Sequence, residues 1–240
     1  MPKSKSEIYN SLYSKLKQYA SPEHAKRSKG VLNSNHQLLG VPVPVLKQMA
    51  SDFKKDVQGI FDFDDVCRLC SRLWRGRYHE QRELALIILE KYARFFDDQT
   101  WDMLNEWIDN ADAWDLIDRI SVSLLGRMLA KDLKRIDELE DWTKSDNFWR
   151  RRTAAATCVA LMHGKNSFPD ESLKVCVHLL DDQELMVQKA VAWLLREVSE
   201  KTPEKTFELM MKHKKKIPRF ILREGSKKLS DLQKMELLVK

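Results

Sequence analysis

The stretch MVQKAVAWLLREVSEK at residues 186–201 decides the fold. It contains no proline or glycine, and its apolar residues recur at the three- and four-residue spacing of an α-helix. They form a single arc that consists of Val187, Ala190, Val191, Leu194, Leu195 and Val198. The stretch therefore predicts an amphipathic helix with one face against a core.

Four other segments of the chain resemble this one. They are HEQRELALIILEKYAR (79–94), AWDLIDRISVSLLGRML (113–129), FWRRRTAAATCVALMH (148–163) and RFILREGSKKL (219–229). When the five segments are aligned, one column holds a charged residue in each: Arg82, Asp118, Arg152, Lys189 and Arg223. The steps in this column are 36, 34, 37 and 34 residues, a period typical of solenoids built from helix pairs.

The sequence thus predicts an all-α fold, an α-α superhelix of HEAT-like repeats, as a single domain over residues 1–240. No run alternates apolar and polar residues for long enough to indicate a sheet. Each helix pair would bury its face against its neighbours, and the stack would curve into a concave surface lined by the second helix of each pair. The charged column would then become a row of side chains along one groove.

Charge is distributed unevenly along the chain. The net charge of +6 is the sum of +6 in residues 1–60, −7 in residues 61–200 and +7 in residues 201–240. Two basic ends of a curved chain could meet one polyanion, whereas solvated lysines on ordinary surface helices would explain the same numbers.

Several functional classes lack support in the sequence. There is no apolar run long enough for a transmembrane helix, and the N-terminal segment MPKSKSEIYN lacks the apolar region of a secretory signal, so we expect a cytoplasmic, nucleoid-associated protein without a membrane partner. Cys67 and Cys70 form a lone CxxC, which we interpret as reduced thiols. The histidines show no metal spacing and no phosphate-binding loop occurs, so we expect no metal and no cofactor.

Two carboxylates follow Trp114 on the segment AWDLIDRI (113–120). Asp115 lies about 100° round the predicted helix from the indole and can point at water. Asp118 lies four residues on from Trp114, on the same face. Because it is the one anion in the charged column, Asp118 either serves a function there or pairs with Arg152 or Arg82 of a neighbouring repeat.

Trp193 falls outside the apolar arc of its helix and lies with Lys189 and Arg196. An aromatic ring between two cations suits nucleic acid, because cations hold phosphates and the ring packs on a sugar or base. The alternative is that another element covers the indole.

The run Arg150-Arg151-Arg152 spans about 200° of helix, so its three side chains cannot share one face. Arg152 emerges beside the packed stripe, where its planar fork suits a phosphate. We expect the other two arginines to be solvated.

Four motifs together resemble the DNA alkylation repair family, the HEAT-like alkylpurine DNA glycosylases of the AlkD type. They are LLGVPVPVLK (38–47), WDLID (114–118), DNFWRRR (146–152) and VQKAVAWLLRE (187–197). The resemblance runs from about residue 10 to residue 230. It implies a C-shaped solenoid with a concave basic groove that cups duplex DNA. It also implies an enzyme that excises cationic N3- and N7-alkylated purines by hydrolysing the N-glycosidic bond, with the base left stacked and not flipped.

The resemblance also assigns roles to residues. The family's catalytic aspartate matches Asp118, its sugar-facing tryptophan Trp114, its groove arginine Arg152 and its second lesion-side tryptophan Trp193. The DNA-binding positions that we predict are Lys47, Arg82, Arg152, Lys189, Arg196 and Arg223. The expected partner is double-stranded DNA with alkylated bases, bound by a monomer.

Two other functional classes fit the same residues. A non-catalytic binder of damaged or branched DNA on this scaffold would use Trp193 and the basic column for affinity alone. A helical-repeat scaffold for proteins would offer Trp193 to a protein partner and would not bind DNA.

Overall fold

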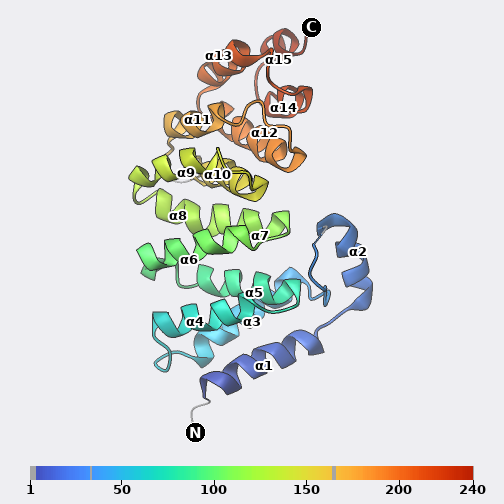
Figure 1. The fold of residues 1–240 in the computed structure, drawn as a ribbon, viewed down its shortest axis with the longest axis vertical. Coiled ribbons are helices and arrows are strands. Elements are labelled where there is room, and N and C mark those ends of the chain that lie inside the picture. The colour runs from blue at the N-terminus through green and yellow to red at the C-terminus, as the bar shows by residue number, and fades with distance from the viewer. Residues whose placement is uncertain (1–3, 33, 164–165, 240) are drawn as a thin grey trace. The chain divides into compact units, whose positions relative to one another are not determined.

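The chain is almost entirely helical in a computed structural model that describes residues 4–32, 34–163 and 166–239 (Figure 1). Within these residues there is no strand, only an isolated bridge between Gln37 and Tyr78, so the predicted all-α class is confirmed. The first three residues of MPKSKSEIYN lie outside the described part. None of the described helices is both long and apolar enough to cross a bilayer.

The chain forms two compact units. The first consists of the described residues up to Met103 together with Asp112–Leu116, and the second consists of Leu104–Ala111 and the described residues from Ile117 onward. Two helices, α6 (Asp98–Asp109) and α7 (Trp114–Asp118), contribute residues to both units. The single domain over residues 1–240 stays a prediction.

The first unit is organised around α5. Its other helices are α1 (Lys5–Gln18), α2 (Pro22–Leu32), α3 (Val43–Asp56), α4 (Phe63–Trp74) and the short η1 (Ala93–Phe95). Every residue of α5 (His79–Glu90) except the last is buried, and α1, α3 and α4 all pack on it. Such a helix, surrounded on all sides, forms the centre of a core. By contrast, α2 has no buried residue.

The loop before α3 is fixed by a buried carboxylate. Glu80 accepts hydrogen bonds from the backbone N–H groups of Leu39 and Gly40, at 2.9 and 2.6 Å. Gly40 has φ of +78°, and a Cβ there would lie 2.1 Å from the carbonyl oxygen of Ser21, so no other residue fits. Pro44 lies in the first turn of α3, where its missing N–H costs no hydrogen bond.

The second unit is a stack of helices in chain order. Its elements are η2 (Arg119–Leu125), α8 (Gly126–Leu129), η3 (Leu133–Arg135), α9 (Ile136–Trp142), α10 (Phe148–Ala160), α11 (Pro169–Val177), α12 (Leu185–Ser199), α13 (Pro203–His213), α14 (Arg219–Gly225) and α15 (Asp231–Leu238). The inner column runs from η2 through α10 and α12 to α14, each packed on the next (Figure 1).

The apolar arc predicted for α12 is confirmed, because all six of its residues are buried. On α10 the buried positions 152–159 are mostly small, with three consecutive alanines at 154–156. Small side chains let α10 contact η2, α8, α9, α11 and α12 at once.

The helix after Asp118 departs from α geometry. Arg119–Leu125 is a π-helix, a conformation that often occurs at functional sites and that the apolar periodicity did not predict. The Ser121 hydroxyl donates to the Ile117 carbonyl at 2.7 Å within this segment. The π-helix ends at Gly126, where the chain passes close to α10: a Cβ on Gly126 would lie 2.2 Å from Cβ of Ala160.

We expect Gly126→Ala to lower the free energy of unfolding by about 1–3 kcal/mol, because the added methyl group overpacks the contact with Ala160. Urea denaturation would measure the change. The matched control is Gly30→Ala on α2, where an added Cβ meets nothing within 4 Å. This change should be neutral or stabilise by up to about 1 kcal/mol. Equal effects of the two substitutions would contradict the account of the close approach.

Candidate active site

A bidentate ion pair joins Asp118 at the end of α7 to Arg152 on α10. Arg152 donates from Nε to Oδ1 at 2.9 Å and from Nη2 to Oδ2 at 2.8 Å. Its Nη1 donates to the carbonyl oxygen of Met186. The Arg152 side chain is 6% exposed, whereas that of Asp118 is 20% exposed. The guanidinium thus lies inside the protein and holds a carboxylate that still reaches the surface.

This geometry corrects the expectation that the fork of Arg152 holds a phosphate. All three guanidinium nitrogens already donate to protein oxygens, and the group is nearly excluded from solvent. The alternative that Asp118 pairs with Arg152 is confirmed.

The other two arginines of the run are paired, so the expectation that they are solvated was wrong. Arg150 donates to both oxygens of Asp109, at 2.6 and 2.5 Å, and to the side chain of Asn105 at 2.6 Å. Arg151 donates to Asp182 at 2.6 Å. Successive helical residues point about 100° apart, so the run reaches three different neighbours of α10. The hydrogen bond from Arg150 lowers the pKa of Asp109.

Lys189, Trp193 and Arg196 lie on α12 as predicted, with different exposures. Lys189 is exposed, and Trp193 and Arg196 are half-buried. The Trp193 indole N–H donates to Oε1 of Glu197 at 3.2 Å, and Arg196 donates to the carbonyl oxygen of Glu224 at 3.3 Å. The side chain of Arg223, on α14, is 63% exposed and contacts the carboxylate of Glu224. Lys189 and Arg223 are therefore the cations of the predicted row that this unit presents to solvent.

In the first unit, Trp114 is half-buried and its indole N–H donates to the carbonyl oxygen of Val31 at 3.1 Å. The end of α2 thus fixes the ring. Lys47 is exposed on α3, as a phosphate contact requires. Arg82 is 8% exposed, and its guanidinium lies over the ring of Trp74, 4.9 Å from the centroid. Burial lowers the pKa of Arg82 and places it poorly for DNA.

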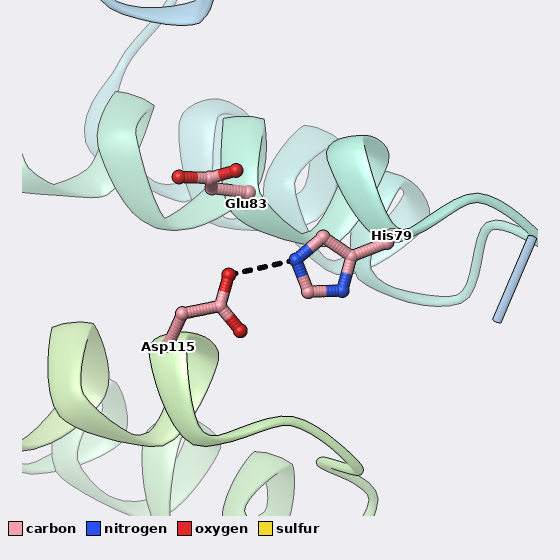
Figure 2. A group of neighbouring side chains, drawn as sticks. All are labelled: His79, Glu83 and Asp115. Carbon is pink, nitrogen blue, oxygen red and sulfur yellow. Dashed lines mark hydrogen bonds and ion pairs between the residues drawn. The ribbon is translucent and has the colours of Figure 1, made fainter. Parts of the chain in front are cut away.

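Asp115 does not point at water but bonds to His79 on α5. Figure 2 shows the contact between Oδ2 of Asp115 and Nε2 of His79, at 2.8 Å, with the carboxylate of Glu83 nearby. The His79 ring is 1% exposed. Burial lowers the pKa of His79, but the hydrogen bond to Asp115 and the surrounding carboxylates more than offset it, so the pKa is raised.

The cluster of His79, Glu83 and Asp115 has the residue types of a metal site. Ligand atoms of His79, Glu83 and Asp115 lie within 4.8 Å of one another. A histidine that ligates a metal almost always donates its other ring N–H to an acceptor. Nδ1 of His79 is buried and has no such partner among the described residues. The direct contact between Nε2 and Asp115 instead indicates a pair that fixes α7 on α5.

A regular spacing in the sequence could have revealed this pair. His79 precedes Asp115 by 36 residues, the same step that separates Arg82 from Asp118 in the charged column. His79 and Asp115 therefore occupy equivalent positions three residues earlier in the two repeats. The charged column does not include these two positions, so it did not predict the pair.

Comparisons with known proteins found one matching family model and several similar solved structures. A family model described as DNA alkylation repair enzyme matches residues 12–229. No curated protein matches the chain. A predicted DNA alkylation repair enzyme from Enterococcus faecalis superposes with a TM-score of 0.78 at 21% identity, over 88% of this chain and 97% of that one.

Two further solved structures are similar. AlkD2 from Streptococcus mutans has a TM-score of 0.61 at 18% identity, over 79% of this chain and 91% of that one. The Pseudomonas fluorescens alkylpurine DNA glycosylase AlkC, bound to DNA containing an abasic site analog, has a TM-score of 0.60 at 18% identity, over 97% and 66%. These likenesses confirm the predicted all-α superhelical fold.

We expect Arg152→Met to lower the free energy of unfolding by roughly 2–4 kcal/mol, because it removes a buried guanidinium that binds both oxygens of the Asp118 carboxylate. Guanidinium denaturation would measure the loss. Lys144→Met removes one partner of an exposed pair with Asp141 and should cost less than about 1 kcal/mol. A similar small effect at Arg152 would show that the ion pair does not hold the unit together.

The raised pKa of His79 predicts a pH dependence of stability. Its contribution is fully present below the unfolded-state pKa of about 6.5 and is lost as the pH rises through the higher folded-state value. We therefore expect the free energy of unfolding to fall as the pH rises above about 6.5, and His79→Gln to flatten this fall. His24→Gln, at an exposed position on α2, should leave the slope unchanged. An unaltered slope in His79→Gln would refute the assignment.

Proposed function

The chain belongs to the DNA alkylation repair enzyme family, and we propose that it is a glycosylase that excises cationic N3- and N7-alkylated purines from duplex DNA. The observation that carries this proposal is the geometry of Asp118. The carboxylate is fixed by Arg152 from the protein side and stays partly exposed on the other. It occupies the position at which the sequence resemblance expects the catalytic aspartate.

The chemistry explains why a carboxylate suits this position. An alkylated purine already carries positive charge, so it can leave without a protonated acid. The difficult part is the sugar, which becomes an oxocarbenium-like cation as the C1′–N bond breaks. A carboxylate that is already oriented stabilises this cation and can direct the attacking water.

Arg152 acts on the reaction through Asp118. A carboxylate has about four lone-pair positions, and the bidentate fork of Arg152 occupies two of them. The Asp118 side chain is also 20% exposed, so water or the sugar can reach it. In this proposal Arg152 sets the orientation of the carboxylate and does not contact a phosphate.

Trp114 and Trp193 would stabilise the positive charge on the sugar and on the alkylated base. An indole presents an electron-rich face that attracts cations. Trp114 lies one turn before Asp118 on α7 and is fixed by the carbonyl oxygen of Val31. We propose that Trp114 faces the sugar and that Trp193 faces the alkylated nucleotide, with the base left stacked in the duplex.

Duplex DNA is the proposed partner because exposed cations lie on helices of both units. These cations are Lys47 on α3, Lys189 on α12 and Arg223 on α14. Contacts from lysine and arginine to phosphates release counterions and so give an affinity that falls with salt. The structural relative AlkC holds DNA in its crystal structure, which supports the same partner here.

We expect Asp118→Asn to lower the rate of base release by about 100-fold or more, because it removes the charge that stabilises the sugar cation. Release of N7-methylguanine and N3-methyladenine from duplex DNA would be measured under single-turnover conditions. Asp141→Asn, on an exposed surface pair, is the matched control and should keep the wild-type rate. Circular dichroism would confirm that both variants are folded at the assay temperature.

The same assay separates the other functional classes. Wild-type release by Asp118→Asn would exclude Asp118 as the catalytic group. No release by the wild-type protein, with DNA binding retained, would identify a non-catalytic DNA binder. If the wild-type protein neither releases a base nor binds DNA at low salt, the result would favour a scaffold for proteins.

A further inference from the structure

One carboxylate on α12 connects the indole of Trp193 to a histidine of the preceding helical layer. Oε1 of Glu197 accepts the indole N–H of Trp193 at 3.2 Å, and Oε2 lies 3.0 Å from Nε2 of His163. His163 follows the end of α10. The side chains of Glu197 and His163 are 24% and 53% exposed.

We propose that Glu197 is a positioning residue that orients Trp193 for excision, with His163 holding the carboxylate in place. This inference rests on the proposed function, since it assigns to Trp193 a contact with the alkylated nucleotide. Glu197 itself contacts neither DNA nor the reacting atoms.

The geometry restricts the indole. Trp193 is half-buried, so packing alone covers only part of its side chain. Residues four apart on a helix are neighbours, which brings the carboxylate of Glu197 to the N–H edge of the ring. A hydrogen bond to an ionised acceptor is roughly twice as strong as one between neutral groups. The bond therefore favours one orientation of the ring.

His163 restricts the carboxylate in turn. Each oxygen of Glu197 has its own partner, so rotation of the carboxylate would break one contact or both. The contact also joins the turn that follows α10 to α12; these two helices carry Arg152 and Trp193. The orientation of Trp193 is thereby tied to the helix that holds Asp118 in place.

The hydrogen bond also strengthens the ring as a partner for cations. When a carboxylate accepts the indole N–H, electron density rises over the ring, and its face attracts a cation more strongly. An N3- or N7-alkylated purine and the developing sugar cation both carry positive charge, so they gain from this change.

The charge of Glu197 is otherwise unexpected on this face of α12. Lys189 and Arg196 lie on the same side of the helix as Trp193, and DNA phosphates would be repelled by an acidic neighbour. Because its carboxylate binds the Trp193 indole and the His163 imidazole, Glu197 orients Trp193 but lowers the affinity for DNA to some degree.

The experiment compares three variants in two measurements, with Glu200→Gln as the control at an exposed glutamate of the same helix end. The test variants are Glu197→Leu, which removes the acceptor, and Glu197→Gln, which keeps a neutral acceptor. The first measurement is the ¹H–¹⁵N NMR signal of the Trp193 indole, assigned by its loss in Trp193→Phe. The second is single-turnover release of N7-methylguanine, together with the Kd for the same duplex.

We expect the indole proton signal to move upfield and exchange faster with water in Glu197→Leu, and to move less in Glu197→Gln. Base release should fall about 10-fold in Glu197→Leu and recover in part in Glu197→Gln, with the Kd little changed. Glu200→Gln should match the wild-type protein in both measurements.

Two results would overturn the inference: an indole signal unchanged in Glu197→Leu, or a shifted signal with an unchanged release rate. Failure of the proposed function looks different, because the wild-type protein itself would then release no base. The NMR measurement needs no substrate, so it still reports whether Glu197 binds the indole.

Discussion

The ion pair between Asp118 and Arg152 is the interaction on which the second unit depends. Burial of a guanidinium without partners costs free energy, and this one, which is 6% exposed, has a carboxylate and a backbone carbonyl as partners. The pair joins α7 to α10, and the carbonyl belongs to Met186 on α12. The Arg152 side chain therefore connects α7, α10 and α12. Its partner on α7, Asp118, is the residue to which we assign the chemistry.

Polar contacts between neighbouring repeats recur along the chain with the period of the repeat. In the described part of the chain, polar side chains that contact partners about one repeat away include His79 with Asp115, Asp118 with Arg152, His163 with Glu197, and Asp170 with Lys205, at separations of 36, 34, 34 and 35 residues. In a solenoid each repeat contacts only its neighbours, so such pairs fix the register between layers. In these pairs the charged and polar groups hold neighbouring repeats together, and only exposed groups are available to a ligand.

Periodicity predicted the elements of this fold but not the partners of its long side chains. The arc of α12 was confirmed in full because burial of an amphipathic face follows directly from apolar spacing. Arg82, Arg150 and Arg151 turned out to be buried or paired, because a flexible arginine reaches whichever carboxylate the tertiary fold brings near. The π-helix after Asp118 left no trace in the pattern, since it changes the hydrogen bonding without changing which residues are apolar. The catalytic and DNA-binding roles of the predicted site residues stay predictions.

In the candidate site, the contacts of Arg152 differ from those expected for a phosphate-binding residue. The roles expected for Trp114, Asp118 and Trp193 stay predictions. The guanidinium of Arg152, which was expected to hold a phosphate, instead binds the carboxylate of Asp118. In the proposed function the reacting group is a preoriented carboxylate, and exposed lysines and arginines supply the affinity for DNA. A carboxylate that does not also bind DNA suits a substrate whose leaving group is already charged, because the reaction then requires little beyond electrostatic stabilisation of the sugar cation.

The most direct test of this account is a double-mutant cycle on the rate of N7-methylguanine release. The four proteins are the wild type, Asp118→Asn, Arg152→Met and the double variant, compared at a temperature at which all are folded. If Arg152 acts through Asp118, the double variant should be no slower than Asp118→Asn alone. Losses that multiply would contradict the account and would show that Arg152 acts on the DNA independently.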